Sequence, residues 1–87
     1  MRIFPTLTFK KKSEKLSKKI QLALTERITL FIENPYHPLL NNHKLNGSRK
    51  SQRSFNVTGD WRIIFEETHP GIVRFLDIDT HTNLYGK

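Results

Sequence analysis

Cysteine is absent from this 87-residue chain, and acidic residues are few. Without cysteine there are no disulfide staples, no thiolate ligands for zinc and no thiol nucleophile. No apolar run approaches the roughly 20 residues that span a bilayer, and the first residues are too polar for a signal peptide. These absences favour a cytoplasmic protein with no membrane contact.

Basic residues, in contrast, are abundant. Lys and Arg number 15 against 8 Asp and Glu, which gives a formal net charge of +7. For a small chain this excess indicates an anionic partner, either nucleic acid or an acidic protein. The length allows one domain only, so we expect residues 1–87 to form a single unit.

The first part of the chain has a helical pattern. Residues 2–7 can form a short strand, which Pro5 confines to an edge or ends. Residues 9–16 predict a short, exposed, Lys-rich helix. Ser17 is a good N-cap for a second helix that runs to about Glu33, where Asn34-Pro35 ends it. Apolar residues on one face of this helix are Ile20, Leu24, Ile28 and Phe31.

The second part has a strand pattern. Residues 35–52 are polar, contain two prolines and a glycine, and predict a connector. From Arg53 the apolar period changes to two, which predicts strands over 53–58 and 61–66. Gly59-Asp60 between them fits a two-residue type II′ turn. After a second turn at 69–71, residues 72–78 are apolar on both faces, which predicts an internal strand.

This order predicts an α+β fold. An N-terminal strand and a C-terminal three-stranded meander form a mainly antiparallel sheet, and a two-helix hairpin packs on one face. The residues expected to face the helices are Phe55, Val57, Trp61, Ile63 and Phe65. The opposite face carries Asn56, Thr58, Arg62 and Ile64. A face without helices is free to bind a ligand.

Four segments together resemble one known family. They are Asn34-Pro35 after an amphipathic helix, His43-Lys44-Leu45-Asn46-Gly47, the strand pair from Arg53 to Phe65 with Asp60-Trp61 at its turn, and Thr80-His81-Thr82-Asn83-Leu84-Tyr85-Gly86. The set resembles the RelE/ParE toxin superfamily, and within it the YafQ-like toxins of type II toxin–antitoxin modules. The match covers nearly the whole chain in order.

The resemblance implies a compact α+β toxin, a small acidic antitoxin, and ribosome-dependent cleavage of mRNA without a metal or cofactor. Carried over position by position, the functional residues of the YafQ-like branch are His43, Asn56, Asp60, His81 and Tyr85. Asn56 departs from the branch, which has a histidine there. Asparagine cannot act as an acid or base near neutral pH, so a weak or inactive enzyme is one alternative.

Metal-free RNA cleavage requires proton transfer at two oxygens. The attacking 2′-OH loses a proton, and the leaving 5′-oxygen gains one. Histidine suits both steps because its ordinary pKa lies near the working pH. We expect His81 to act as general acid and His43 as general base or phosphate ligand. Asp60 can orient a histidine or take the 2′-OH proton, although a carboxylate in such a turn often serves the turn itself.

The other candidate residues would bind RNA. Arg53 and Arg62 are candidates to stabilise the charge of the phosphorane. Tyr85 can stack on a base or pack the C-terminal tail. Lys11, Lys12 and Lys15 can contact ribosomal RNA or form a solvated helix face.

Besides a plain nucleic-acid-binding module, two further interpretations of the chain stay open. One is a ParE-like inhibitor of DNA gyrase, which has the same fold and needs no catalytic histidines. The other is a catalytically degenerate relative, which Asn56 suggests. The spacing of the four histidines matches no helix-based metal-ligand motif.

Overall fold

The computed structural model describes residues 1–49 and 51–85, apart from the side chains of 48 and 85. In chain order its elements are β1 (Arg2–Pro5), α1 (Leu7–Glu14), α2 (Lys18–Glu33), the 3-10 helix η1 (Pro38–Leu40), β2 (His43–Lys44), the 3-10 helix η2 (Gly47–Arg49), β3 (Arg53–Asn56), β4 (Trp61–His69), β5 (Ile72–Thr80) and α3 (His81–Tyr85).

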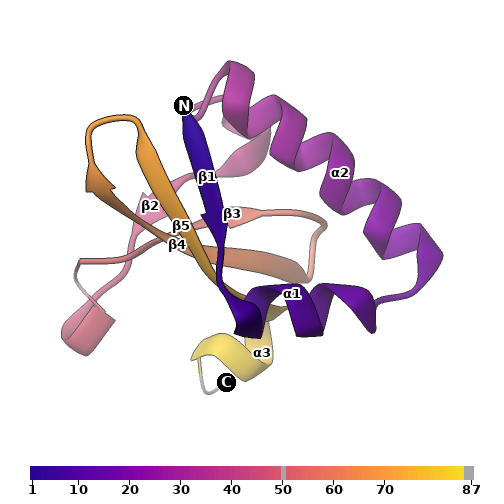
Figure 1. Ribbon diagram of the computed structural model, residues 1–87. Helices are drawn as coiled ribbons and strands as arrows, with labels where there is room; N and C mark the ends of the chain where they lie inside the picture. Colours follow the sequence, from indigo (N-terminus) through magenta and orange to yellow (C-terminus); the bar gives the residue numbers. More distant parts are fainter. Residues whose placement is uncertain (50, 86–87) are drawn as a thin grey trace.

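The strands form one five-stranded sheet in the order β1-β5-β4-β3-β2. β1 runs parallel to β5, and the other neighbours are antiparallel. Figure 1 shows α2 crossing one face of this sheet. The predicted α+β fold is confirmed, and β5 is internal as its two-faced apolar pattern indicated.

Side-chain caps begin both long helices. The hydroxyl of Thr6 accepts the backbone N–H of Phe9, and that of Ser17 accepts the N–H of Ile20. α1 therefore begins two residues earlier than the Lys-rich pattern indicated. The Thr6 hydroxyl also donates to the carbonyl oxygen of Leu76 at 3.2 Å. This bond ties the start of α1 to β5 just beyond the end of β1.

The connection between β3 and β4 differs from the predicted type II′ turn. Such a turn requires a positive φ at Gly59, and Gly59 has none. Residues 57–60 instead form a wider loop, closed by a bond from the Val57 N–H to the Trp61 carbonyl at 2.9 Å. Within it the Thr58 hydroxyl accepts the Trp61 N–H at 3.1 Å. The left-handed glycine lies in the next turn, where Gly71 has a φ of 79°.

Phenylalanines form the centre of the core between α2 and the sheet. Phe31 of α2 stacks on Phe55 with ring centroids 4.5 Å apart, and it meets Phe65 edge-on at 5.0 Å. Phe75 lies 6.0 Å from the same ring. The residues predicted to face the helices all lie in or against this cluster. Its density explains why α2 stays on this face of the sheet.

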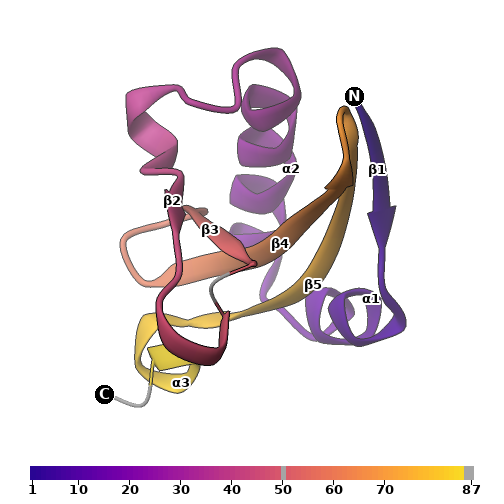
Figure 2. The same ribbon diagram turned by 90° about the vertical axis from the view of Figure 1, so that its left-hand side faces the viewer.

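The opposite face is partly covered, which the alternation did not predict. Ile64 was expected on an open face, but it is buried with Leu45 and Leu84. Leu84 belongs to α3, and Leu45 follows β2, and neither element was expected from the sequence. Figure 2 shows α3 beside the segment that follows β2. This cluster covers the middle of the face and leaves other parts of it free.

The predicted connector at residues 35–52 also needs correction. It contains β2, whose two residues pair with Arg53 and Ser54 of β3 and extend the sheet by one strand. A strand of two residues has no alternating pattern to detect, so only the pairing defines it. No helix within the described residues is long and apolar enough to cross a membrane.

Replacing Phe31 with leucine should lower the free energy of unfolding by about 1–3 kcal/mol, because it removes the aromatic pairs and changes the core shape. Leu22→Ala on the same helix is the control, since Leu22 is 64% exposed and should change stability by less than about 0.5 kcal/mol. Urea unfolding of both variants measures the difference. Equal effects would contradict the central place of Phe31.

Candidate active site

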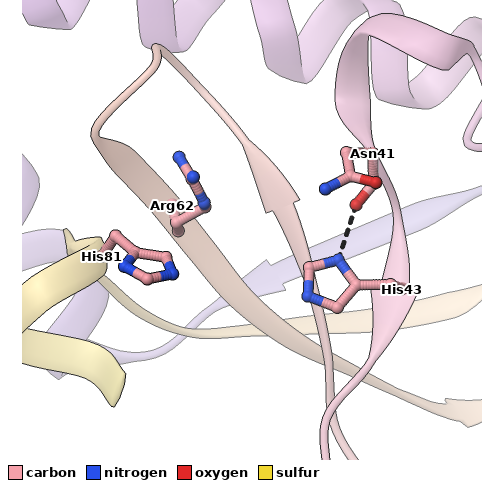
Figure 3. A pocket seen from close by; sticks show the side chains of 4 residues that line it. All are labelled: Asn41, His43, Arg62 and His81. Carbon is pink, nitrogen blue, oxygen red and sulfur yellow. Dashed lines mark hydrogen bonds between the residues drawn. The ribbon is translucent and has the colours of Figure 1, made fainter. Parts of the chain in front are cut away.

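A hollow of about 230 Å³ lies on the partly covered face of the sheet. Its lining residues come from three separate parts of the chain and are Asn41, His43, Arg62 and His81 (Figure 3). Three of them were candidate site residues from the sequence. The fold thus brings His43, Arg62 and His81 together across 38 residues of chain.

The orientation of His43 is set by a bond from its own ring. Nδ1 of His43 lies 2.7 Å from the carbonyl oxygen of Asn41. A carbonyl oxygen only accepts, so Nδ1 carries the hydrogen and donates it. In the neutral ring Nε2 is then the acceptor, which is the form that a general base needs.

Asn41 contributes to the hollow through an unusual backbone conformation. Its φ of 47° lies in the left-handed region, which asparagine tolerates better than most residues. This residue ends η1 and turns the chain into β2. The sequence analysis did not select it. The pair Asn41-Asn42 after a leucine run was the available signal, since asparagine is common at such turns.

Arg62 on β4 is held by the loop that precedes it. Its Nη1 donates to the carbonyl oxygens of Thr58 at 3.1 Å and Gly59 at 3.0 Å. These bonds use one nitrogen of the guanidinium group, which has five N–H donors in all. The anchored side chain is a fixed cation at the hollow, and its other nitrogens can donate to an anion there.

His81 begins α3 directly after β5. Its backbone N–H donates to the carbonyl oxygen of Asp60 at 2.8 Å. Thr80 caps the short helix, since its hydroxyl accepts the N–H of Asn83. Figure 3 shows the His81 and Arg62 side chains near one another on one side of the hollow and the His43 ring on the other side. Two imidazoles and one guanidinium group therefore share the hollow.

Two of the other sequence candidates lie outside this hollow. The side chain of Asp60 is on the exposed loop, and it is the Asp60 carbonyl that reaches His81. Arg53 lies elsewhere, because its Nε donates to Asn42 at 2.8 Å and its guanidinium sits 5.5 Å from the Tyr36 ring. The predicted role of Arg53 at the phosphorane does not fit this position.

Asn56, the position of the missing histidine, is also outside the hollow. It lines a separate depression of about 150 Å³ with Arg27 and Leu39. Its side-chain oxygen is buried and has no hydrogen-bond partner among the described residues. The side chain of Tyr85 lies outside the described residues.

The three candidate lysines of α1 have different surroundings. Lys11 and Lys15 are exposed. Lys12 instead forms ion pairs with Asp77 at 2.8 Å and Asp79 at 2.9 Å on β5. Its charge is therefore largely compensated within the protein.

Asp79 connects three elements at this corner of the molecule. One oxygen accepts from Lys12, and the other accepts from the Asn83 side chain and the Thr80 N–H, both at 2.8 Å. The hydrogen bonds that Lys12 donates to Asp77 and Asp79 raise the pKa of Lys12. Burial acts to raise the pKa of Asp79, but the bonds from Asn83, Lys12 and Thr80 outweigh it and lower that pKa overall.

The arrangement suits phosphate chemistry. A fixed cation in the same hollow as two groups that can transfer protons suits in-line transfer at phosphorus. No group of three or more His, Cys, Asp or Glu in the described part of the chain is placed to hold a metal ion.

Solved structures with this fold are similar over nearly the entire chain. YafQ from E. coli strain BL21(DE3) is 30% identical, with a TM-score of 0.77, over 99% of this chain and 100% of YafQ. This chain belongs to the RelE/ParE toxin superfamily. It is a YafQ-like member, in agreement with the motifs of its sequence.

Other structures support the same assignment of the YafQ-like chain. YafQ in the E. coli DinJ–YafQ complex is again 30% identical, with a TM-score of 0.75 over 99% of this chain and 100% of that one. The YoeB/ParE toxin from Agrobacterium tumefaciens is 16% identical, with a TM-score of 0.76 over 93% of this chain and 99% of that one, and shows the shared fold. No protein-family model and no curated sequence matches the chain.

Lys12→Met should lower the free energy of unfolding at pH 7 by up to about 1 kcal/mol, because it removes ion pairs that are partly exposed. The raised pKa means that this stabilisation is complete below 10.5 and is lost as the pH rises through the higher folded value. Asp79 has a lowered pKa, so its share is complete above 3.8 and is lost as the pH falls through the folded value.

Urea unfolding of wild type and Lys12→Met across this pH range tests the ion pairs. The difference between them should shrink toward both extremes. Lys11→Met is the control, because Lys11 is an exposed neighbour on the same helix. A pH-independent difference would show that Lys12 acts through packing of its alkyl chain alone.

Proposed function

We propose that this YafQ-like chain is the toxin of a type II toxin–antitoxin module, an endoribonuclease that cleaves mRNA on the ribosome without a metal ion. One observation carries the proposal. His43, Arg62 and His81 line a single hollow, which brings one guanidinium group and two imidazoles together. A protein that only binds gyrase has no need of this arrangement.

The first step is proton removal from the attacking hydroxyl. The Nδ1–H of His43 is engaged with Asn41, so its Nε2 is the acceptor. It takes the proton of the 2′-OH as that oxygen attacks the neighbouring phosphorus. The ring then carries a positive charge, which the Asn41 carbonyl stabilises through the bond to Nδ1.

The second requirement is stabilisation of the phosphorane. Arg62 stays charged at all working pH values and can donate to two phosphate oxygens. Its anchoring to the Thr58 and Gly59 carbonyls places that charge before substrate arrives. Such preorganisation is a large part of how fixed donors lower a barrier.

The last step is departure of the 5′-oxygen. His81, when protonated, gives its proton to this oxygen as the P–O5′ bond breaks. The products are a 2′,3′-cyclic phosphate and a 5′-hydroxyl. Because one histidine must start neutral and the other protonated, the rate should depend on pH with a bell shape.

The sequence suggested that the Asp60 carboxylate takes a proton, but we give Asp60 a different role. Its carbonyl accepts the backbone N–H of His81 and so holds the start of α3 against the β3–β4 loop. We assign it to positioning. Arg53 has no part in the proposed chemistry.

A small acidic antitoxin is the proposed protein partner. The E. coli YafQ that this chain resembles is found in complex with DinJ. The net charge of +7 provides electrostatic complementarity to an acidic protein. Such complementarity chiefly speeds association, and salt weakens it.

His81→Ala should reduce the single-turnover rate of mRNA cleavage on programmed ribosomes by about 10²–10⁴-fold, because the leaving oxygen loses its proton donor. His69→Ala is the matched control, since His69 is exposed and lies at the opposite end of β4 from Arg62. It should leave the rate unchanged. Thermal melts establish that both variants are folded.

A folded His81→Ala protein that cleaves within a few-fold of wild type would overturn this mechanism. The gyrase-inhibitor and inactive interpretations would then be favoured. Binding to gyrase, measured with the same variants, separates those two.

Lys11→Gln and Lys15→Gln should each flatten the salt dependence of ribosome binding by about one unit of slope, if each contacts one phosphate. Lys12→Gln should change the slope less, because Asp77 and Asp79 already compensate its charge. Binding measured at several salt concentrations tests this order. If Lys11→Gln and Lys15→Gln leave the slope unchanged, these lysines form a solvated helix face and do not contact phosphates.

A further inference from the structure

A second hollow adjoins the candidate active site on the other side of His43. Its volume is about 240 Å³. The lining residues are His43, Lys44, Leu45, Asn46, Arg49 and Leu84. His43 lines both hollows, so the two share a wall.

Arg49 is the unusual residue of this second hollow. The residue is half-buried, and its Nη1 is buried without a hydrogen-bond partner among the described residues. Leaving a charged donor buried and unpaired is costly. The residues that line the hollow include no carboxylate. An anion bound there would therefore meet two cations, Arg49 and Lys44, and no carboxylate.

Backbone hydrogen bonds hold Arg49 to described residues on both sides of it. The N–H of Arg49 donates to the Asn46 carbonyl, and the Arg49 carbonyl accepts from Gln52 at 2.8 Å. A bond from the Leu45 N–H to the Gln52 carbonyl at 3.0 Å closes the loop. Leu45 and Leu84 provide an apolar side to the same hollow, in contact with Ile64 beneath.

We propose that the Arg49 hollow is a phosphate subsite, which holds the RNA phosphate next to the one cleaved. This inference rests on the proposed function. Neighbouring phosphates of a strand are joined through one ribose, and His43 lines both hollows, so a strand with one phosphate at Arg62 can continue past His43 toward Arg49. Arg49 provides the charged donors for the phosphate, and the leucines contact the attached sugar or base.

Two uncleavable probes test the subsite without any reaction. They are the deoxyadenosine dinucleotide, with one phosphate, and the trinucleotide, with two. Neither has a 2′-OH nucleophile. The wild-type protein should bind the trinucleotide about tenfold more tightly, which is the gain expected from one charge-assisted hydrogen bond. Titrations followed by NMR give both affinities.

Arg49→Gln should bring the ratio of the two affinities close to one, and Arg49→Lys should retain part of it. The control is Arg74→Gln, which removes the same charge from an exposed ion pair with Glu66. Arg74→Gln should keep the wild-type ratio. Thermal melts confirm folding of each variant.

Three results would overturn the subsite. They are a wild-type ratio near one, an unchanged ratio in Arg49→Gln, and an equal fall in Arg74→Gln, which would indicate net charge alone. The test is separate from that of the proposed function. If cleavage on ribosomes depends on His81 but the affinity ratio does not depend on Arg49, only the subsite is wrong. If the affinity ratio depends on Arg49 but no cleavage occurs, the proposed enzyme activity is wrong and the anion site stands.

Discussion

The antiparallel pairing of β4 with β5 is the constraint on which the rest of the molecule depends. It sets Trp61 opposite Thr80 and Arg62 opposite Asp79. The last residue of β5 therefore lies beside the start of β4, and α3 begins there with His81. The bond from His81 to the Asp60 carbonyl closes this corner. For this reason Arg62 of β4 and His81, which follows β5, line the same hollow.

The same pair of strands also organises the two faces of the sheet. Alternation sends Ile63 and Phe65 toward α2 and sends Arg62 and Ile64 to the other side. The aromatic cluster around Phe31 makes the first face a buried, packed core. On the second face Ile64 packs with Leu45 and Leu84, and Leu76 lies against them. The small size of this second cluster leaves space for the two hollows that flank His43.

Positive charge is divided unequally over the chain. Lys12 is compensated by two aspartates, and Arg53 is engaged with Asn42 and Tyr36. Arg62 is anchored to carbonyl oxygens, which fix its position and leave its charge uncompensated. The net charge therefore indicates the class of binding partner, and the contacts that each cation makes within the protein decide which cations can bind that partner.

The sequence by itself determined the elements that have strong local signals. Ser17 and Asn34-Pro35 mark the ends of α2, and the change of apolar period at Arg53 marks the strands, because caps and periodicity act over a few residues. Motifs spread along the chain also indicated His43 and His81 as candidate site residues. Tertiary structure decided the rest. β2 exists through its pairing with β3, α3 is held by the burial of Leu84 against Leu45 and Ile64, and His81 reaches the hollow of His43 only after folding. These last contacts join residues far apart in the chain, so no local pattern encodes them.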